Sequence, residues 1–245
     1  MAHQLIGLTL CFMAAFNGAQ LDSQGVPDTL GESESTVPLW VAADVAANPD
    51  GSLRADVFLP AIRRDIEAML NLPVERGCIR VGRILIDQRN ADQDRTTFAG
   101  ALRSAHIVAV TRVVGSRAGF FQGIPGQLVA AVPENVYKGA GLPVYYEFFP
   151  TGNLSVAGKQ ICKKDDDYEP PSIGDRQLVT GNAPFGSEKN VLIPVTPADF
   201  VKVTTDGRVA FPRRYVESDS SLEGIDIQAV RSRLHNWFIA PRREP

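Results

Sequence analysis

Residues 106–114 read His-Ile-Val-Ala-Val-Thr-Arg-Val-Val, a run dominated by β-branched side chains. Such side chains are typical of strands, because they pack well on a pleated surface. Further runs of this kind are separated by Gly, Pro and Asn clusters that indicate turns; they cover residues 127–132, 144–149, 176–179, 190–193 and 200–204. Short strands at this spacing favour a small antiparallel barrel or sandwich over a parallel α/β sheet.

Segments on both sides of this β-rich region have helical spacing. Ile62, Ile66 and Leu70 fall on one helical face, and a shorter helical turn is expected near residues 98–102. Towards the C-terminus, Asp226 can cap a helix; its apolar face would consist of Ile227, Val230, Leu234 and Trp237. The predicted fold class is therefore mainly β, and α+β overall.

Turn residues help to divide the chain. Apolar runs at 38–46 and 53–59 flank Asn48-Pro-Asp-Gly51, which predicts a hairpin. With the helix that follows, this hairpin forms an N-terminal α+β extension over residues 37–104. We place the β-barrel at residues 105–215, and the C-terminal helix and tail at residues 216–245.

The N-terminal residues predict export. Residues 5–16 are apolar and uncharged, too short for the roughly 20 residues that cross a bilayer, and well sized for the apolar part of a signal peptide. We expect a signal peptide at 1–19, a flexible polar linker at 20–36, and a secreted or periplasmic chain with no membrane span once the leader is removed. A buried N-terminal helix or strand is the alternative for the same residues.

The chain has 3 cysteines, of which Cys11 would leave with the leader. Cys78 and Cys162 would then remain in a compartment where disulfides persist, so we predict that they pair. Two free buried thiols are the alternative. The formal net charge of -3 gives no reason to expect a nucleic-acid partner, because such binding depends on neutralising phosphates.

Three short motifs carry a resemblance. They are Ala105-His-Ile-Val-Ala-Val-Thr-Arg-Val113, Glu134-Asn-Val-Tyr-Lys-Gly139 and Ile173-Gly-Asp-Arg-Gln-Leu-Val179. This pattern resembles that of uncharacterised secreted bacterial proteins, which are similar in layout to the OB-like barrel of netrin-type and tissue-inhibitor-of-metalloproteinase-type modules. The resemblance covers less than half of the chain, and it implies a small OB-like barrel that is used for binding.

The usual catalytic signatures are missing from the sequence. It contains no Gly-x-Ser-x-Gly elbow, no His-Glu-x-x-His motif and no phosphate-binding loop. We therefore assign no catalytic residue, expect no cofactor, and consider the acidic run 163–169 a solvated loop more readily than a calcium site. One alternative is an extracellular hydrolase in which His106, Glu147 and Asp175 converge from separate strands, and another is an envelope structural module.

Two features suggest binding. Residues 119–126 read Gly-Phe-Phe-Gln-Gly-Ile-Pro-Gly, a loop in which Phe120, Phe121 and Ile124 would form an exposed apolar patch. Alternatively, one of the two phenylalanines plugs an end of the barrel. Glu147 lies among aromatic residues of a strand, where burial would raise its pKa; the alternative is a rim carboxylate paired with an arginine. The resulting expectation is a secreted, non-catalytic β-barrel protein that binds an unknown protein or glycan.

Overall fold

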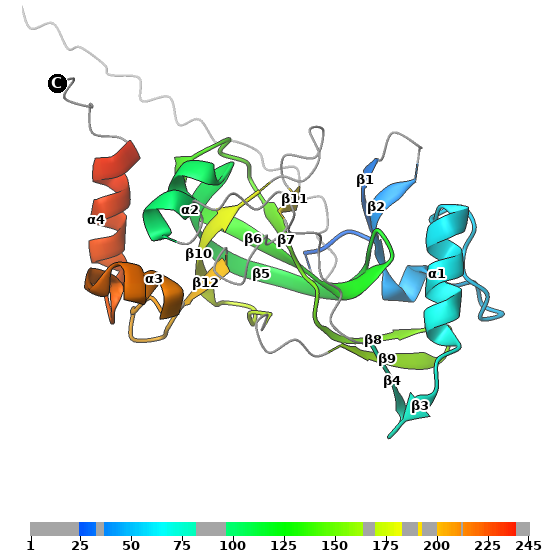
Figure 1. The fold of residues 1–245 in the computed structure, drawn as a ribbon. Coiled ribbons are helices and arrows are strands. Elements are labelled where there is room, and N and C mark those ends of the chain that lie inside the picture. Colours follow the sequence, from blue (N-terminus) through cyan, green and yellow to red (C-terminus); the bar gives the residue numbers. More distant parts are fainter. Residues whose placement is uncertain are drawn as a thin grey trace, which may run out of the picture.

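The computed structural model describes residues 25–32, 37–81, 97–163, 170–182, 191–192, 200–211 and 213–238. An eight-stranded sheet forms its centre, and α4 stands at one end of the molecule while α1 and a small sheet lie at the other (Figure 1). The strands of the large sheet are β1 (Thr29–Glu32), β2 (Pro38–Ala42), β5 (Ile107–Phe121), β6 (Ile124–Lys138), β7 (Tyr145–Phe149), β10 (Arg176–Gly181), β11 (Val191–Leu192) and β12 (Phe200–Val203).

The long hairpin of β5 and β6 organises this sheet. Each strand has 15 residues, and Gln122 and Gly123 join them with φ of 48° and 81°. Two central residues with positive φ match the right-handed twist of a hairpin. On its other edge β5 pairs with β10 along its first half and with β2 along its last residues. Strand β5 therefore connects the part of the sheet that contains β10 to the part that contains β2.

The large sheet is strongly curled. Hydrogen bonding places β12, β10, β5, β6 and β7 side by side in that order. Nevertheless the rings of Phe200 on β12, the first of these strands, and Phe149 on β7, the last, have centroids 5.2 Å apart. The mainly β, α+β class is confirmed. Within the described ranges no pairing joins β12 to β7 or β11, so a closed barrel is not found.

A smaller four-stranded sheet packs beside the end of the hairpin. It consists of β3 (Val74–Glu75), β4 (Cys78–Arg80), β8 (Gly152–Val156) and β9 (Lys159–Lys163). The predicted disulfide is present: Cys78 and Cys162 are bonded, with Cα atoms 5.9 Å apart, and β4 runs parallel to β9. The bond ties the N-terminal extension to the chain that follows β7.

Among the described residues, three of the α-helices lie where the sequence predicts helical spacing, whereas the helix at Arg213–Ser218, which crosses the predicted end of the barrel at residue 215, was not predicted. The α-helices are α1 (Pro60–Leu70), α2 (Phe98–Ser104), α3 (Arg213–Ser218) and α4 (Ile227–Phe238), with short 3₁₀ turns η1 (Ala43–Val45) and η4 (Ser220–Leu222). Asp226 caps α4 as predicted, because its Oδ1 accepts a hydrogen bond from the Ala229 N–H at 2.8 Å. Helix α4 buries Val230 and Leu234 against strand residues of the sheet. Trp237, predicted on that buried face, is instead 48% exposed.

Two expectations about the chain path need correction, and one pair of strands was not predicted. Part of the predicted linker, residues 29–32, forms β1, because β2 offers it a free edge for antiparallel pairing. Residues 53–59 form no strand beyond the Ala47–Leu53 bridge; Val57 and Phe58 enter a core cluster instead. Strands β8 and β9 were not predicted as a pair, because their five-residue lengths and mixed polarity give a weak pattern.

Several expectations lie outside the described residues. These are the signal peptide at 1–19, the linker residues 20–24 and 33–36, the acidic residues 164–169 and the last residues of the chain. Among the described residues, no helix is long and apolar enough to cross a membrane.

Candidate functional site

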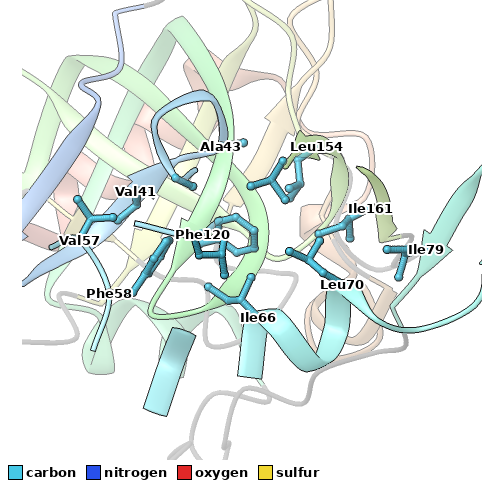
Figure 2. Close-up of a cluster of buried hydrophobic side chains, with 13 residues drawn as sticks. Val41, Ala43, Val57, Phe58, Ile66, Leu70, Ile79, Phe120, Leu154 and Ile161 are labelled. Atoms are coloured by element: carbon cyan, nitrogen blue, oxygen red, sulfur yellow. The ribbon is translucent and has the colours of Figure 1, made fainter. Parts of the chain in front are cut away.

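The exposure predicted for Phe120 and Phe121 is wrong. Phe120 is fully buried, and Figure 2 shows it among the side chains that join α1 to the sheets, including Phe58 and Ile66. Phe121 is 4% exposed and packs on the other face, with its ring 5.1 Å from that of Phe148. Ile124 is half-buried against the same cluster. These side chains are core residues, so we assign them no binding role. The alternative expected one of the two phenylalanines to plug a barrel end, but both are buried, in different clusters, and no closed barrel is found among the described strands.

The glycines of this segment also have a packing role. Gly119 and Gly126 are opposite each other in β5 and β6. A Cβ on Gly119 would lie 2.7 Å from the Trp40 ring, and one on Gly126 would lie 2.7 Å from the Phe148 ring. The missing side chains let two aromatic rings rest on the backbone. The segment is a continuous hairpin, and the glycine pattern that suggested a loop arises from this close contact.

Glu147 is fully buried inside the curled sheet. Its carboxyl oxygens accept hydrogen bonds from Gln177 Nε2 at 2.7 Å and from the Thr111 hydroxyl at 3.3 Å. Burial raises the pKa of this carboxyl to about 8, although both hydrogen bonds act in the opposite direction. The expected burial with a raised pKa is present, and no arginine pairs with Glu147 in the described structure. Because the group is enclosed, it is a polar element of the core.

The three residues of the hydrolase alternative are not brought together. The His106 backbone N–H bonds to Gly181 at one end of β10, whereas Asp175 precedes the other end. The six residues of β10 separate these ends by roughly 20 Å. Asp175 instead pairs with Lys202 at 2.7 Å, which lowers its pKa.

A cluster of charged residues that the sequence did not single out lies where α4 meets the sheet. We call Arg112, Glu134, Arg176 and Arg231 the arginine cluster. Glu134 Oε1 accepts from Arg112 Nη2 at 2.7 Å, and Oε2 accepts from the Nη2 atoms of Arg176 and Arg231, each at 2.7 Å. The Nε atoms of Arg112 and Arg176 bond to the same carboxylate at 3.2 and 3.1 Å. One negative charge is thus shared by three positive charges.

The electrostatics of this cluster leave unbalanced charge. Burial alone would raise the pKa of Glu134, but the hydrogen bonds and charges of Arg176 and Arg112 outweigh it and lower the pKa, so the carboxylate stays ionised at neutral pH. Arg112 and Arg176 are directly opposite each other on β5 and β10. Like charges at such positions destabilise a sheet. Glu134 relieves only part of that repulsion, because its one carboxylate faces three guanidinium groups and leaves the cluster with a net positive charge.

An open recess continues from Arg231 along the groove between β6 and α4. We call it the polar recess; its volume is about 430 Å³, and it is lined by Asn135, Val136, Tyr137, Arg231, Ser232, His235 and Asn236. Burial raises the pKa of Tyr137, against the opposing charge of Arg231, so its phenol remains neutral. The recess and the arginine cluster share Arg231 and adjoin along β6, where Glu134 precedes Asn135.

This arrangement can hold an anion. Guanidinium groups bind carboxylate, sulfate and phosphate through paired N–H donors. Arg112 retains 54% of its side-chain exposure and Arg176 retains 27%, so both are accessible to a ligand. Within the described residues no group of three or more His, Cys, Asp or Glu side chains is placed to hold a metal ion.

Sequence reasoning missed the arginine cluster because its members lie far apart along the chain. Arg112 and Arg176 belong to strands that pair in space, and Arg231 comes from a helix whose docking position no local pattern reveals. The only local signal was the charged Arg112 within the β-branched run 107–114, and that run does not show which residues Arg112 contacts.

A second, more enclosed pocket of about 290 Å³ lies on the other flank of α4. It is mostly apolar and is formed by residues of α2, η4 and α4, with Trp237 at its edge. Its two charged residues are already engaged, because Asp219 accepts from the Ser221 backbone N–H and Arg233 donates to the Ser221 hydroxyl. We therefore take the arginine cluster and the polar recess as the candidate site. Comparison of the chain with protein families, curated proteins and solved structures found no match.

Proposed function

We propose that the chain is a secreted, non-catalytic binding protein, and that its ligand is held by a negatively charged group at the arginine cluster. One observation supports this most strongly: three arginines converge on the single carboxylate of Glu134 beside an open recess. If the cluster only held α4 on the sheet, a single arginine from the helix, paired with Glu134, would be sufficient. The other two arginines, Arg112 and Arg176, are a like-charged pair on neighbouring strands, which makes the sheet less stable. Glu134 offsets only part of their charge, and a bound anion would offset more of it.

The fold and the disulfide support the remaining parts of the proposal. The curled five-strand arrangement agrees with an OB-like layout, in which binding is the common role. The disulfide between Cys78 and Cys162 is consistent with a protein that functions outside the cytoplasm, in an oxidising compartment. N-terminal sequencing of exported protein tests this second part. A mature chain beginning near Gln20 supports secretion, and a cytosolic product that retains Met1 contradicts it.

The binding proposal is tested with a polysulfated glycan, heparin, and with uncharged dextran as the neutral probe. Arg112→Gln removes one exposed charge while Arg176 and Arg231 still hold Glu134. We expect heparin affinity to fall about 5-fold in this variant, the value for one exposed charged contact of about 1 kcal/mol. Binding should also weaken as salt concentration rises.

Arg64→Gln is the matched control, because Arg64 is an exposed arginine of α1 at the opposite end of the molecule. It makes the same change in net charge and should alter heparin affinity less than 2-fold, within the range of a small screened effect. Equal losses in the two variants would show attraction by overall charge only. No heparin binding by the unmodified protein, or equal binding of dextran, would contradict the proposal.

A further inference from the structure

The side chains of the polar recess include more hydrogen-bond acceptors than a simple anion requires. A sulfate or phosphate ion uses only donors, which arginines supply. The recess adds the amides of Asn135 and Asn236, which both donate and accept, and the Tyr137 phenol and His235 imidazole, which can do so as well. Acceptors of this kind match a ligand that itself carries hydroxyl donors.

These groups are also available. Within the described part of the chain, the side chains of Asn135, Tyr137, His235 and Asn236 make no hydrogen bond, although each lines the recess. Ser232 differs, since its hydroxyl donates to the Gln228 carbonyl at 2.9 Å and so keeps only acceptor capacity for a ligand. A polar ligand bound here would therefore replace water and would not have to break internal bonds.

The size and surface of the recess restrict the ligand further. A volume of about 430 Å³, open to solvent, suits one or two sugar rings better than a protein helix. The Tyr137 ring and Val136 supply apolar surface among the polar groups. Sugar rings have this same mixed character, with hydroxyls around the edge and C–H groups on the faces.

We infer that the polar recess binds an acidic glycan, with its hydroxyls on Asn135, Tyr137 and Asn236 and its acidic group on Arg231 and the arginine cluster. This inference rests on the proposed function, because the acidic group occupies the anion site described above. It goes further in assigning the ligand class and in giving the uncharged residues a role.

The test compares three probes by isothermal titration calorimetry. They are a uronic-acid tetrasaccharide, the same tetrasaccharide with each carboxylate reduced to a primary alcohol, and inorganic sulfate. We expect the acidic tetrasaccharide to bind at least 10-fold more tightly than either of the others, because only it uses both sets of groups. A reduced tetrasaccharide that binds equally well would overturn the assignment of its acid group to the arginines.

Asn236→Ala provides the variant that separates this inference from anion binding alone. It leaves every charge in place, and we expect it to lower tetrasaccharide affinity about 5-fold, as the loss of one ligand hydrogen bond does, without changing sulfate affinity. Asn153→Ala on β8 is the matched control, since Asn153 is exposed and lies outside the recess, and it should change neither affinity.

The outcomes distinguish the two proposals. If sulfate and the acidic tetrasaccharide bind equally, and Asn236→Ala changes neither affinity, the glycan inference is overturned while anion binding stands. If neither probe binds, the glycan inference is overturned, and anion binding is overturned with it when the unmodified protein also fails to bind heparin. Circular dichroism of each variant verifies that the fold is unchanged, and a folded Asn236→Ala variant that binds the tetrasaccharide normally counts against the inference.

Discussion

Replacing Glu147 with glutamine should change how the stability of the protein depends on pH. The carboxyl is fully buried and its pKa lies at about 8, against a value of 4.5 for an exposed glutamate. Between these two values the folded protein holds a proton that the unfolded chain has released. Proton linkage then requires the free energy of unfolding to fall as pH rises through this window.

The size of the effect follows from the two pKa values. One unit of difference corresponds to about 1.4 kcal/mol, so at pH 7 the unmodified protein has lost about 3 kcal/mol of the stability that it has below pH 4.5. Glu147→Gln removes the titration. Its amide keeps an acceptor for Gln177 Nε2 and can donate to the Thr111 hydroxyl, so the core stays satisfied.

Urea unfolding at pH 4 and at pH 7 measures this difference. All other titrating groups are common to both proteins. The difference between their free energies of unfolding, compared at the two pH values, therefore reports the titration of Glu147 alone. We expect Glu147→Gln to gain about 3 kcal/mol on the unmodified protein between pH 4 and pH 7. Parallel pH profiles for the two proteins would refute the reasoning, because they would show that Glu147 is ionised in the fold.

Three further substitutions test the packing. Phe120→Ala should destabilise the protein by about 3–5 kcal/mol in denaturant unfolding, the usual cost of removing a fully buried phenylalanine, and a loss below about 1 kcal/mol would contradict its place in the core. Gly126→Ala should cost about 1–3 kcal/mol or more, because its Cβ would overlap the Phe149 carbonyl oxygen and lie 2.7 Å from the Phe148 ring, whereas Gly141→Ala, with nothing within 4 Å, should be nearly neutral; equal melting temperatures would contradict the close contact. Replacing Cys78 and Cys162 together by alanine should cost about 4 kcal/mol, since the bond closes a long loop with a sequence separation of 84; peptides from unreduced protein that alkylate freely at both cysteines would show that the bond is absent.

Much of the fold could be predicted because local patterns specify it. The β-branched run at 106–114 forms the first half of β5, and the spacing of Ile66 and Leu70 forms the buried face of α1. The disulfide was predicted from the cysteine count together with the expected compartment, and the bond is present. The order of the strands in the sheet could not be predicted, since the pairing of β5 with both β10 and β2 depends on contacts between segments that are distant in the sequence.

The candidate site was harder to predict than the fold, for two physical reasons. Phe120 and Phe121 looked exposed because glycines surround them, but glycine also permits an aromatic ring to approach the backbone, and Trp40 and Phe148 use that space. The arginine cluster depends on Arg231, which reaches Glu134 only after α4 docks on the sheet. Glu147 was anticipated because its neighbours on the same strand are aromatic.

The most direct test of anion binding observes the arginine side chains themselves. The Nε–H groups of arginine give separate signals in two-dimensional ¹⁵N NMR spectra, and each can be assigned by substitution. On titration with heparin oligosaccharides, we predict that the signals of Arg112, Arg176 and Arg231 shift together and saturably, while that of Arg64 stays in place. Shifts at Arg64 as large as those of the cluster, or an unchanged signal from Arg112, would contradict a binding site at the arginine cluster.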